Sequence, residues 1–284
     1  MVKSANEEQI DYWNSAAGRK WVILQEQIDE VLGSLNHPLL AKAQPSAGES
    51  VLDVGCGTGA FTMALGHQVG ASGQVLGLDI AAPLLERAEQ RRQAAGMDQL
   101  CYRQADAQTH SFDGRSLDLI ASRFGVMFFD DPVAAFANMR QALRPGGRLY
   151  FASWSALADN PWFKVPHDAA VAQLGQGSPA PPRAPGPMAF AEIDYVRDIL
   201  EEAGFIEVGG QPETIFLVKD APLDQVAHLA CQLGPVSRLM RELEGTEADL
   251  SAIVEAVKEG FRPYDSDVGV KVPARLNFFS GRNS

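Results

Sequence analysis

The sequence predicts an α/β protein built on a doubly wound parallel sheet. Residues 50–154 alternate between short apolar runs and helical patterns, joined by short connections. Such alternation is typical of a parallel sheet with right-handed crossovers. A glycine-rich loop, "GCGTG", follows the first apolar run. Ligand-binding loops of open α/β sheets lie at that end of a strand, so the loop is the first candidate site.

The individual elements follow from the same pattern and from their boundary residues. Pro83 lies near the first turn of one expected helix and Gly96 follows its end, while Asp131 and Pro132 are suited to begin another. The expected strands are 50–55, 73–80, 100–106, 116–125 and 147–154, and the helices between them are 60–70, 82–96 and 131–147.

The flanking segments have a different character. Apolar residues at helical spacing predict one helix over 21–35, ended by Asn36-His37-Pro38. Further on we expect helices at 161–175, 191–205 and within 221–261, strands at 206–218 (bulged at Gly209-Gly210) and 269–281, and a Pro/Gly-rich loop or lid at 175–190. The expected units are a helical lid (1–45), a cofactor-binding core (46–155) and substrate-cap insertions with the last core elements (156–284).

Composition excludes several classes of function. The 284 residues carry a net charge of −12, which argues against a general nucleic-acid binder. We expect no secretory signal and no membrane-spanning helix. The three cysteines are far apart and show no zinc spacing, so we predict no metal site and a cytoplasmic location.

The glycine loop alone fits two ligands. Gly55, Gly57 and Ala60 match a loose dinucleotide pattern, and Asp79 stands where a ribose-binding acid belongs. This supports a nicotinamide-dependent oxidoreductase as the alternative. Asp53 counts against it, because its carboxylate would lie beside a pyrophosphate with no Lys or Arg between residues 50 and 66 to offset it.

S-adenosylmethionine fits the acids better. Its ammonium and sulfonium are cations, which suit Asp53 and its water shell. Asp79 can accept hydrogen bonds from both ribose hydroxyls, because an ionised carboxylate offers only acceptors. Asp106, after the third strand, can accept from the adenine amine, and the amide of Ala107 can donate to a ring nitrogen.

Five segments of the chain resemble those of a known protein family. The segments "VLDVGCGTG", "GLDIA", "ADAQT", "SRFGVMFFDDP" and "LRPGGRL" resemble, in order and spacing, class I S-adenosylmethionine-dependent methyltransferases of the bacterial small-molecule type, similar to quinone methyltransferases. The resemblance implies a Rossmann-like, seven-stranded sheet whose last strand is antiparallel and lies next to the fifth. It also implies that amino-terminal helices cover the cofactor. The predicted cofactor contacts are Asp53, Gly55, Cys56 (through its backbone), Gly57, Gly59, Asp79, Ile80, Asp106, Ala107, Arg123, Phe124, and Tyr12 and Trp21 of the lid.

The acceptor is harder to predict. Phe124, Trp154, Trp162, Met188 and Phe190 are candidates to contact an apolar or aromatic small molecule, although aromatic side chains at such junctions usually serve packing. If the acceptor needs a general base, the candidates are His110, His167 and His228.

The functional hypothesis is in-line methyl transfer to a small molecule, with oxygen slightly favoured over carbon or nitrogen. A third reading is a methyltransferase-like protein that binds the cofactor without transferring its methyl group, as a partner or a cyclase. A homodimer is left open.

Overall fold

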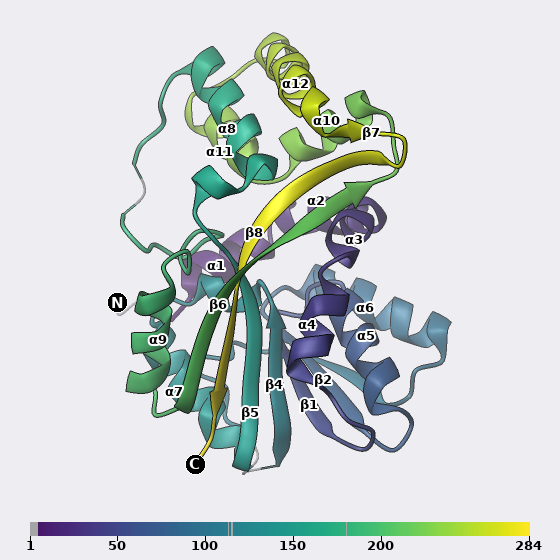
Figure 1. Cartoon of the computed structure of the whole chain (residues 1–284), viewed down its shortest axis with the longest axis vertical. Coiled ribbons are helices and arrows are strands. Elements are labelled where there is room, and N and C mark those ends of the chain that lie inside the picture. Colours follow the sequence, from purple (N-terminus) through teal and green to yellow (C-terminus); the bar gives the residue numbers. More distant parts are fainter. Residues whose placement is uncertain (1–4, 113, 115, 180) are drawn as a thin grey trace.

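The computed structural model describes residues 5–112, 114, 116–179 and 181–284. Among these residues the sheet runs in the order β3-β2-β1-β4-β5-β8-β6, with the short β7 pairing β8 (Figure 1). Strands β1 to β5 are parallel, and β8 lies antiparallel between β5 and β6. The Rossmann-like sheet and its antiparallel last strand are therefore confirmed. The strands are β1 (Ser50–Val54), β2 (Gln74–Asp79), β3 (Leu100–Gln104), β4 (Leu117–Arg123), β5 (Leu143–Trp154), β6 (Ile206–Lys219), β7 (Asp265–Ser266) and β8 (Gly269–Arg282).

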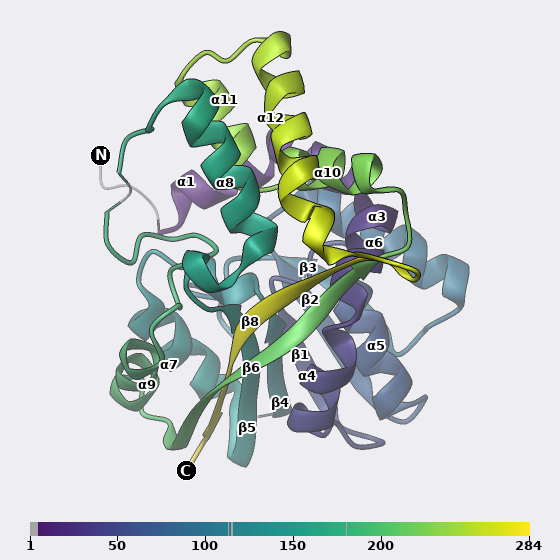
Figure 2. The ribbon, with the colours of Figure 1, turned by 45° about the horizontal axis from the view of Figure 1, so that its top comes forward.

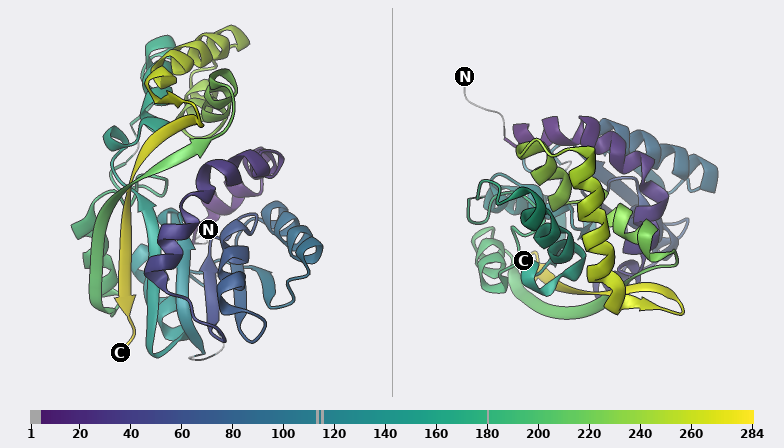
Figure 3. Two further views of the ribbon diagram at one scale, coloured as in Figure 1. Left: turned by 45° about the vertical axis from the view of Figure 1, so that its right-hand side comes forward. Right: turned by 90° about the horizontal axis from the view of Figure 1, so that it is seen from above.

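Helices cover both faces of the core sheet. One face carries α4, α5 and α6, and the other carries α7 and α9, as the left view of Figure 3 shows. The α-helices are α1 (Glu7–Trp13), α2 (Ala16–Ile23), α3 (Gln25–Gly33), α4 (Asn36–Ala43), α5 (Ala60–Val69), α6 (Ala82–Ala95), α7 (Pro132–Ala142), α8 (Pro161–Leu174), α9 (Ile193–Glu202), α10 (Leu223–Gln232), α11 (Pro235–Glu242) and α12 (Glu247–Phe261). Short 3₁₀ turns are η1 (Gly125–Phe128), η2 (Leu157–Asp159) and η3 (Arg262–Tyr264).

The predicted boundaries hold for α5, α6 and the start of α7, but α7 ends at Ala142, five residues before the predicted end, and the boundaries of the amino-terminal segment also differ. Asp131 accepts a hydrogen bond from Ala134 N as the cap of α7, and α6 ends at Gly96 in a left-handed conformation. The single helix expected over 21–35 is instead divided between α2 and α3, with Leu24 between them and a turn at Ser34 and Leu35 before α4 begins. Pro38 lies in the first turn of α4. Backbone N–H groups in a first turn have no partner within the helix, so the missing N–H of proline costs no hydrogen bond there. The proline therefore lies at the start of a helix and does not end one.

Two strands also differ from expectation. β5 begins at Leu143 and includes Pro145 and Gly146, with a register shift against β4 between Leu117 and Leu119. The shift in β6 lies between Ile206 and Gly209, and Glu207 there has a positive φ of 51°. The bulge thus precedes the Gly209-Gly210 pair at which the sequence placed it.

A second, helical part of the molecule lies beyond the core. β6 and β8 continue past the sheet as a long ribbon, and α8, α10, α11 and α12 pack together at its far end (Figures 1 and 2). Helices α1, α2 and α3 lie between this cap and the core. Residues 175–179 and 181–192 form the expected irregular loop, which returns from the cap to η1 through the Gly186 N–Met127 O hydrogen bond of 3.0 Å.

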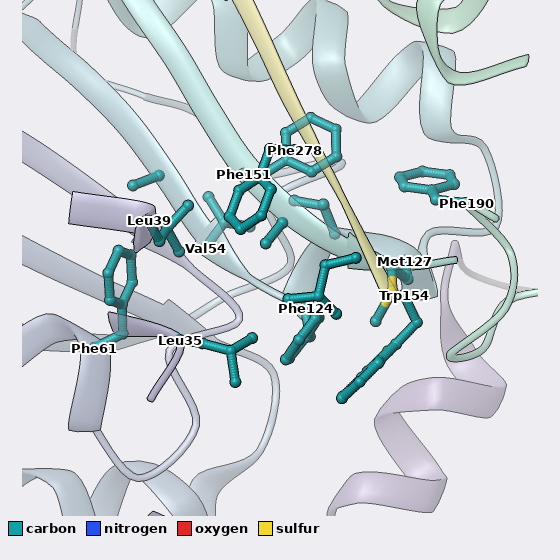
Figure 4. Packing of buried hydrophobic residues seen from close by; sticks show 14 of the residues in the cluster. Leu35, Leu39, Val54, Phe61, Phe124, Met127, Phe151, Trp154, Phe190 and Phe278 are labelled. Carbon is teal, nitrogen blue, oxygen red and sulfur yellow. The ribbon is translucent and has the colours of Figure 1, made fainter. Parts of the chain in front are cut away.

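Buried aromatic and aliphatic side chains fill the core between the sheet and its helices (Figure 4). Phe136, Phe151 and Phe279 form one stack from α7 through β5 to β8, with ring centroids 5.4 Å and 5.1 Å apart. On the other side Leu35 and Leu39 pack with no exposed surface.

Asn160 joins the core to the cap. It is fully buried at the start of α8, where the chain leaves β5. Its Nδ2 donates to the carbonyls of Ser155, Ala156 and Arg275, and its Oδ1 accepts from Arg275 N at 2.9 Å.

We expect Asn160→Ala to destabilise the protein by about 2–4 kcal/mol, because it leaves several buried backbone groups without a partner. Urea unfolding measures the change. Gln93→Ala on the exposed face of α6 is the control and should change the free energy of unfolding by less than about 0.5 kcal/mol. Equal effects of the two variants would contradict the junction role.

Candidate cofactor site

The glycine loop lies at the carboxyl end of β1 and touches the loop that follows β4. A Cβ on Gly55 would lie 2.5 Å from Gly125 Cα, and one on Gly125 would lie 2.3 Å from Val54 O. Ser122 locks this contact, since its Oγ donates to Val54 O at 2.7 Å and accepts from Gly125 N at 3.0 Å. The two strand ends at the predicted switch point are therefore in backbone contact.

Asp79 fixes the glycine loop from the neighbouring strand. Its Oδ2 accepts from Gly57 N at 2.8 Å and its Oδ1 from Ala81 N at 2.9 Å. Burial raises the pKa of Asp79, and these backbone N–H groups oppose that rise. Each oxygen retains a further acceptor position for a ligand hydroxyl.

Asp53 lies beneath the loop with half of its carboxylate unpaired. It is 1% exposed, and its Oδ2 accepts from Thr62 Oγ1 at 2.7 Å, whereas its Oδ1 has no partner. Burial raises the pKa of Asp53 to about 7, the Thr62 hydrogen bond and the charge of Arg123 oppose the rise, and Asp79 adds to it. A buried polar atom without a partner is costly, so this oxygen is suited to a cation or a bound water.

Two glycines of the loop differ in what surrounds them. A Cβ on Gly59 would lie 2.4 Å from the hydroxyl of Tyr102, which reaches the loop from β3. A Cβ on Gly57 would meet nothing within 4 Å. Cys56 is buried, and burial raises the pKa of its thiol well above the ordinary value, which disfavours thiolate chemistry.

Two arginines approach this loop from other elements. The sequence predicts Arg123 as a cofactor contact, but it gives no role to Arg91. Arg91 of α6 donates to Thr58 O at 2.8 Å and pairs with Asp29 of α3 at 2.8 Å. The Arg123 side chain donates to Asn36 Oδ1 at 2.9 Å and so ties β4 to α4. Asp29 balances the charge of Arg91, which leaves the acids dominant. Arg87 and Arg91 are four positions apart, and this spacing is the sequence signal that their side chains share one face of a helix.

Asp106 and its neighbours form the third part of the site. Asp106 follows β3, and its carboxylate accepts from the side chain of Asn6 and from Gln108 N. Ala107 is buried, and its carbonyl accepts from Asn138 of α7 at 2.9 Å. Ile80 O accepts from Asn14 at 3.0 Å. The adenine contacts of Asp106 and Ala107 stay a prediction.

The amino-terminal aromatic residues meet over η1. Trp13 packs edge-to-face against Trp21, Phe128 and Tyr12, with ring centroids between 5.2 Å and 5.7 Å apart. Of the two aromatic residues that the sequence singled out, Trp21 packs against the hydrophobic core, and Trp13 lies between Trp21 and Phe128. Tyr12 itself is 42% exposed.

The predicted acceptor residues fall into separate groups. Phe124 has a left-handed backbone with φ of 69°, and its ring stacks on Trp154 at 4.5 Å. Trp162 stacks on Phe261 inside the cap. Phe190 packs against Phe136 and Phe151 in the core, and Met188 lies in the loop that returns to η1. The structure therefore stacks the rings of Phe124 and Trp154 on each other, whereas Trp162 and Phe190 pack against other rings of the same hydrophobic core.

The three candidate histidines also lie apart. His110 faces Arg103 and Phe112. His167 contacts Asp168 and lines a surface pocket with Ser178 and Arg238. His228 lines another pocket with Gln27 and Lys219. No contact described for these three histidines joins them to the glycine loop.

Comparison with known proteins agrees with this geometry. Residues 52–151, which include the glycine loop, Asp79 and Asp106, match the family described as "Methyltransferase domain". The chain carries a class I methyltransferase domain. In this domain class S-adenosylmethionine is the cofactor, and the match counts against the nicotinamide alternative.

Curated relatives resemble the methyltransferase domain. Aklanonic acid methyltransferase of Streptomyces sp. (strain C5) is 36% identical over 44% of this chain and 56% of that protein. Demethylmenaquinone methyltransferase of Lactiplantibacillus plantarum is 34% identical over 39% and 47%. Nocamycin O-methyltransferase of Saccharothrix syringae is 32% identical over 39% and 40%. The chain thus spans about half the length of the curated relatives it matches.

Solved structures share the fold. The YcgJ protein of Bacillus subtilis superposes with a TM-score of 0.56 at 14% identity, covering 87% of this chain and 97% of that one. The [4+2]-cyclase SpnF superposes with a TM-score of 0.55 at 15% identity, covering 94% and 95%. In the described part of the chain, no helix has the length and apolarity needed to cross a membrane.

The methyltransferase domain has the features that its cofactor requires. The open space at Gly57 and the unpaired oxygen of Asp53 suit an aminoacyl tail that carries positive charge. Asp79 keeps acceptor capacity for ribose hydroxyls. These residues, together with the backbone of the glycine loop, would hold the cofactor.

We expect Gly57→Ala to lower affinity for S-adenosylhomocysteine by about tenfold or more, because its methyl group enters ligand space. Gly146→Ala is the matched control, since Gly146 also has a positive φ with nothing within 4 Å but lies at the other end of β5. Both variants should lose a similar stability of about 1–2 kcal/mol from backbone strain. Calorimetric titration and thermal unfolding separate the two effects, and equal affinity losses would contradict the assignment.

The raised pKa of Asp53 makes cofactor binding pH-dependent. A cation beside the carboxylate favours its ionised form, so binding releases a proton below the pKa of about 7. Affinity for S-adenosylmethionine should rise about fivefold between pH 6 and pH 7, and Asp53→Asn should abolish this slope. Titration at several pH values measures it, and an unchanged slope in the variant would assign the proton to another group.

The same shift affects stability. Because the pKa in the folded chain lies above the ordinary value of 3.8, the folded state binds the proton more tightly than the unfolded state. The contribution of Asp53 to the free energy of unfolding should therefore fall as pH rises from about 4 to about 7, with no such fall in Asp53→Asn. Urea unfolding of the ligand-free protein serves as the control for the binding experiment.

Proposed function

We propose that this protein transfers a methyl group from S-adenosylmethionine to an acidic oxygen of a small, flat acceptor. The observation that carries the proposal is the acid pair beside the glycine loop, Asp53 with its unpaired oxygen and Asp79 with spare acceptor positions. The cofactor, when bound, supplies a methyl group that its sulfonium makes electrophilic. The residues of this chain bind it, orient it and exclude water.

Positioning is the main contribution expected of the protein. Methyl transfer needs the nucleophile in line with the methyl group and sulfur, and alignment with desolvation can supply several kcal/mol, of order 7 or more in well-oriented cases. Phe124 and Trp154 are buried and stacked on each other at the carboxyl ends of β4 and β5, where they form an apolar wall. Such a surface suits a flat aromatic or quinone-like acceptor.

The positions of the three candidate histidines support an acceptor that loses its proton without a general base from the protein. His110, His167 and His228 have partners on three separate surfaces. A phenol or carboxylic acid can be methylated without a general base, whereas an alcohol or carbon acid needs one. Relatives are named for an acid, a quinone and an O-methylation, and among the acceptor atoms that these names allow we favour oxygen.

Similarity of fold to a [4+2]-cyclase suggests a second function to test, namely cofactor binding without methyl transfer. A protein of the same fold that catalyses a [4+2] cyclisation shows that the fold serves more than one reaction. Cofactor binding without methyl transfer would favour this alternative.

The proposal is tested by titration followed by turnover. We expect S-adenosylhomocysteine to bind and NADH not to bind, and we expect one methyl group to be added to phenols or carboxylic acids in an aromatic panel, detected by mass spectrometry. Activity should rise with pH through the pKa of the acceptor, since the proposed reaction begins from an acceptor that has already lost its proton to water. NADH binding without S-adenosylhomocysteine binding would overturn the proposal, and binding of S-adenosylhomocysteine with no product across the panel would replace methyl transfer with the cyclase-type function.

A further inference from the structure

Asn6, which precedes α1, makes an unusual set of contacts. Its side chain is buried although its helix has no buried residue. Its Nδ2 donates to both oxygens of Asp106 at 3.0 Å and to Gln108 Oε1 at 3.1 Å. Its Oδ1 accepts from Asp130 N at 2.6 Å. Every donor and acceptor of one carboxamide is thus used on residues at least 100 positions away.

These contacts fill the carboxylate of Asp106. Its Oδ1 accepts from Asn6 and from Gln108 N at 2.9 Å, and its Oδ2 accepts from Asn6 and from Thr109 Oγ1 at 3.4 Å. A carboxylate has about four acceptor positions, so little capacity remains for another donor. The Nδ2 group of Asn6 therefore occupies the position beside Asp106 that is predicted for the amine of adenine.

The other end of α1 is held in the same way. Asn14 donates to Ile80 O at 3.0 Å and accepts from Ala82 N at 3.0 Å. Helix α1 therefore spans from the loop after β3 to the loop after β2. No residue of α1 is buried, and the two end asparagines and the ring of Trp13 are among the contacts that hold the helix there.

We propose that Asn6 is the positioning residue that fastens the amino-terminal helices over the cofactor site, with Asp106 as its anchor. The inference rests on the proposed function, since it assigns the lid of that same site. In this arrangement Asp106 serves the lid, and the adenine amine is not its main partner. The backbone at Ala107, pinned by Asn138 through Ala107 O and His110 O at 2.9 Å, remains available to the base.

The first test measures lid closure without cofactor. Asn6 has a φ of 57°, so Asn6→Gly keeps the left-handed backbone and removes only the carboxamide. Hydrogen exchange of the ligand-free protein should show amides of 7–14 losing protection by about tenfold or more. Gln44→Gly is the matched control, because Gln44 is also left-handed and its side chain is exposed. Unchanged protection in Asn6→Gly would overturn the proposal.

The second test is a rescue by pH. Asn6→Asp places a carboxyl against Asp106, which repels it when both are ionised and donates to it when one is protonated. Protection of 7–14, corrected for intrinsic exchange rates, should be lost at pH 7 and regained below about pH 5. A structural role unrelated to the hydrogen bond would give no such recovery.

The third test asks what Asp106 recognises. S-Adenosylhomocysteine is compared with S-inosylhomocysteine, in which a carbonyl replaces the amine. We expect Asn6→Gly, Asp106→Ala and the double variant to weaken S-adenosylhomocysteine binding by the same factor, about tenfold, and to preserve the ratio of the two affinities. Loss of that ratio in Asp106→Ala would assign Asp106 to the adenine amine, and tighter binding in Asn6→Gly would make Asn6 an inhibitory plug. Either result overturns the proposal.

The exchange test does not depend on the cofactor. If S-adenosylhomocysteine fails to bind while 7–14 lose protection in Asn6→Gly, the proposed function fails and the lid contact stands. If S-adenosylhomocysteine binds and the exchange is unchanged, the function stands and the lid assignment fails.

Discussion

The cofactor site depends on one carboxylate, that of Asp79, which joins two strand ends. By accepting from Gly57 N and Ala81 N, it fixes the glycine loop of β1 against the first turn after β2. Gly55, Gly57 and Gly59 have no side chains that could hold the loop in place. Larger residues are disfavoured there, because all three glycines have a positive φ and a Cβ on Gly55 or Gly59 would collide with a neighbouring group. An acid on the adjacent strand therefore organises the loop and also faces the ligand.

The same requirement explains the electrostatics beneath the loop. Burial raises the pKa of both buried acids, Asp53 and Asp79, and the charge of Asp79 further disfavours ionisation of Asp53. Arg123 and Thr62 offset part of this cost at Asp53, but one oxygen is left without a partner. A cationic ligand supplies the missing interaction, so the protein gives up some stability in the ligand-free state to favour that ligand.

The sequence was most informative where local chemistry determines structure. Alternating apolar runs, the Asp131 cap and the Gly96 terminator depend on near neighbours, and the structure confirms them. The division of the segment 21–35 at Leu24 and Ser34 could not be read from periodicity, because apolar spacing persists across a break when consecutive helices wrap one core. The roles of Asn6, Asn14, Asp29 and Arg91 depend on contacts between elements far apart in the chain, which no local pattern reports.

The acceptor side was the least predictable for a related reason. Phe124, Trp154, Trp162 and Phe190 are similar aromatic residues in similar sequence contexts, yet only the first two share a contact. Their different ring partners follow from the β6–β8 ribbon, which carries the cap helices away from the sheet, so that Trp162 stacks on Phe261 of α12. Cofactor recognition is built from strand ends whose order is fixed by the sheet, whereas acceptor recognition is built from elements whose position depends on tertiary packing. A sequence therefore identifies the first more readily than the second.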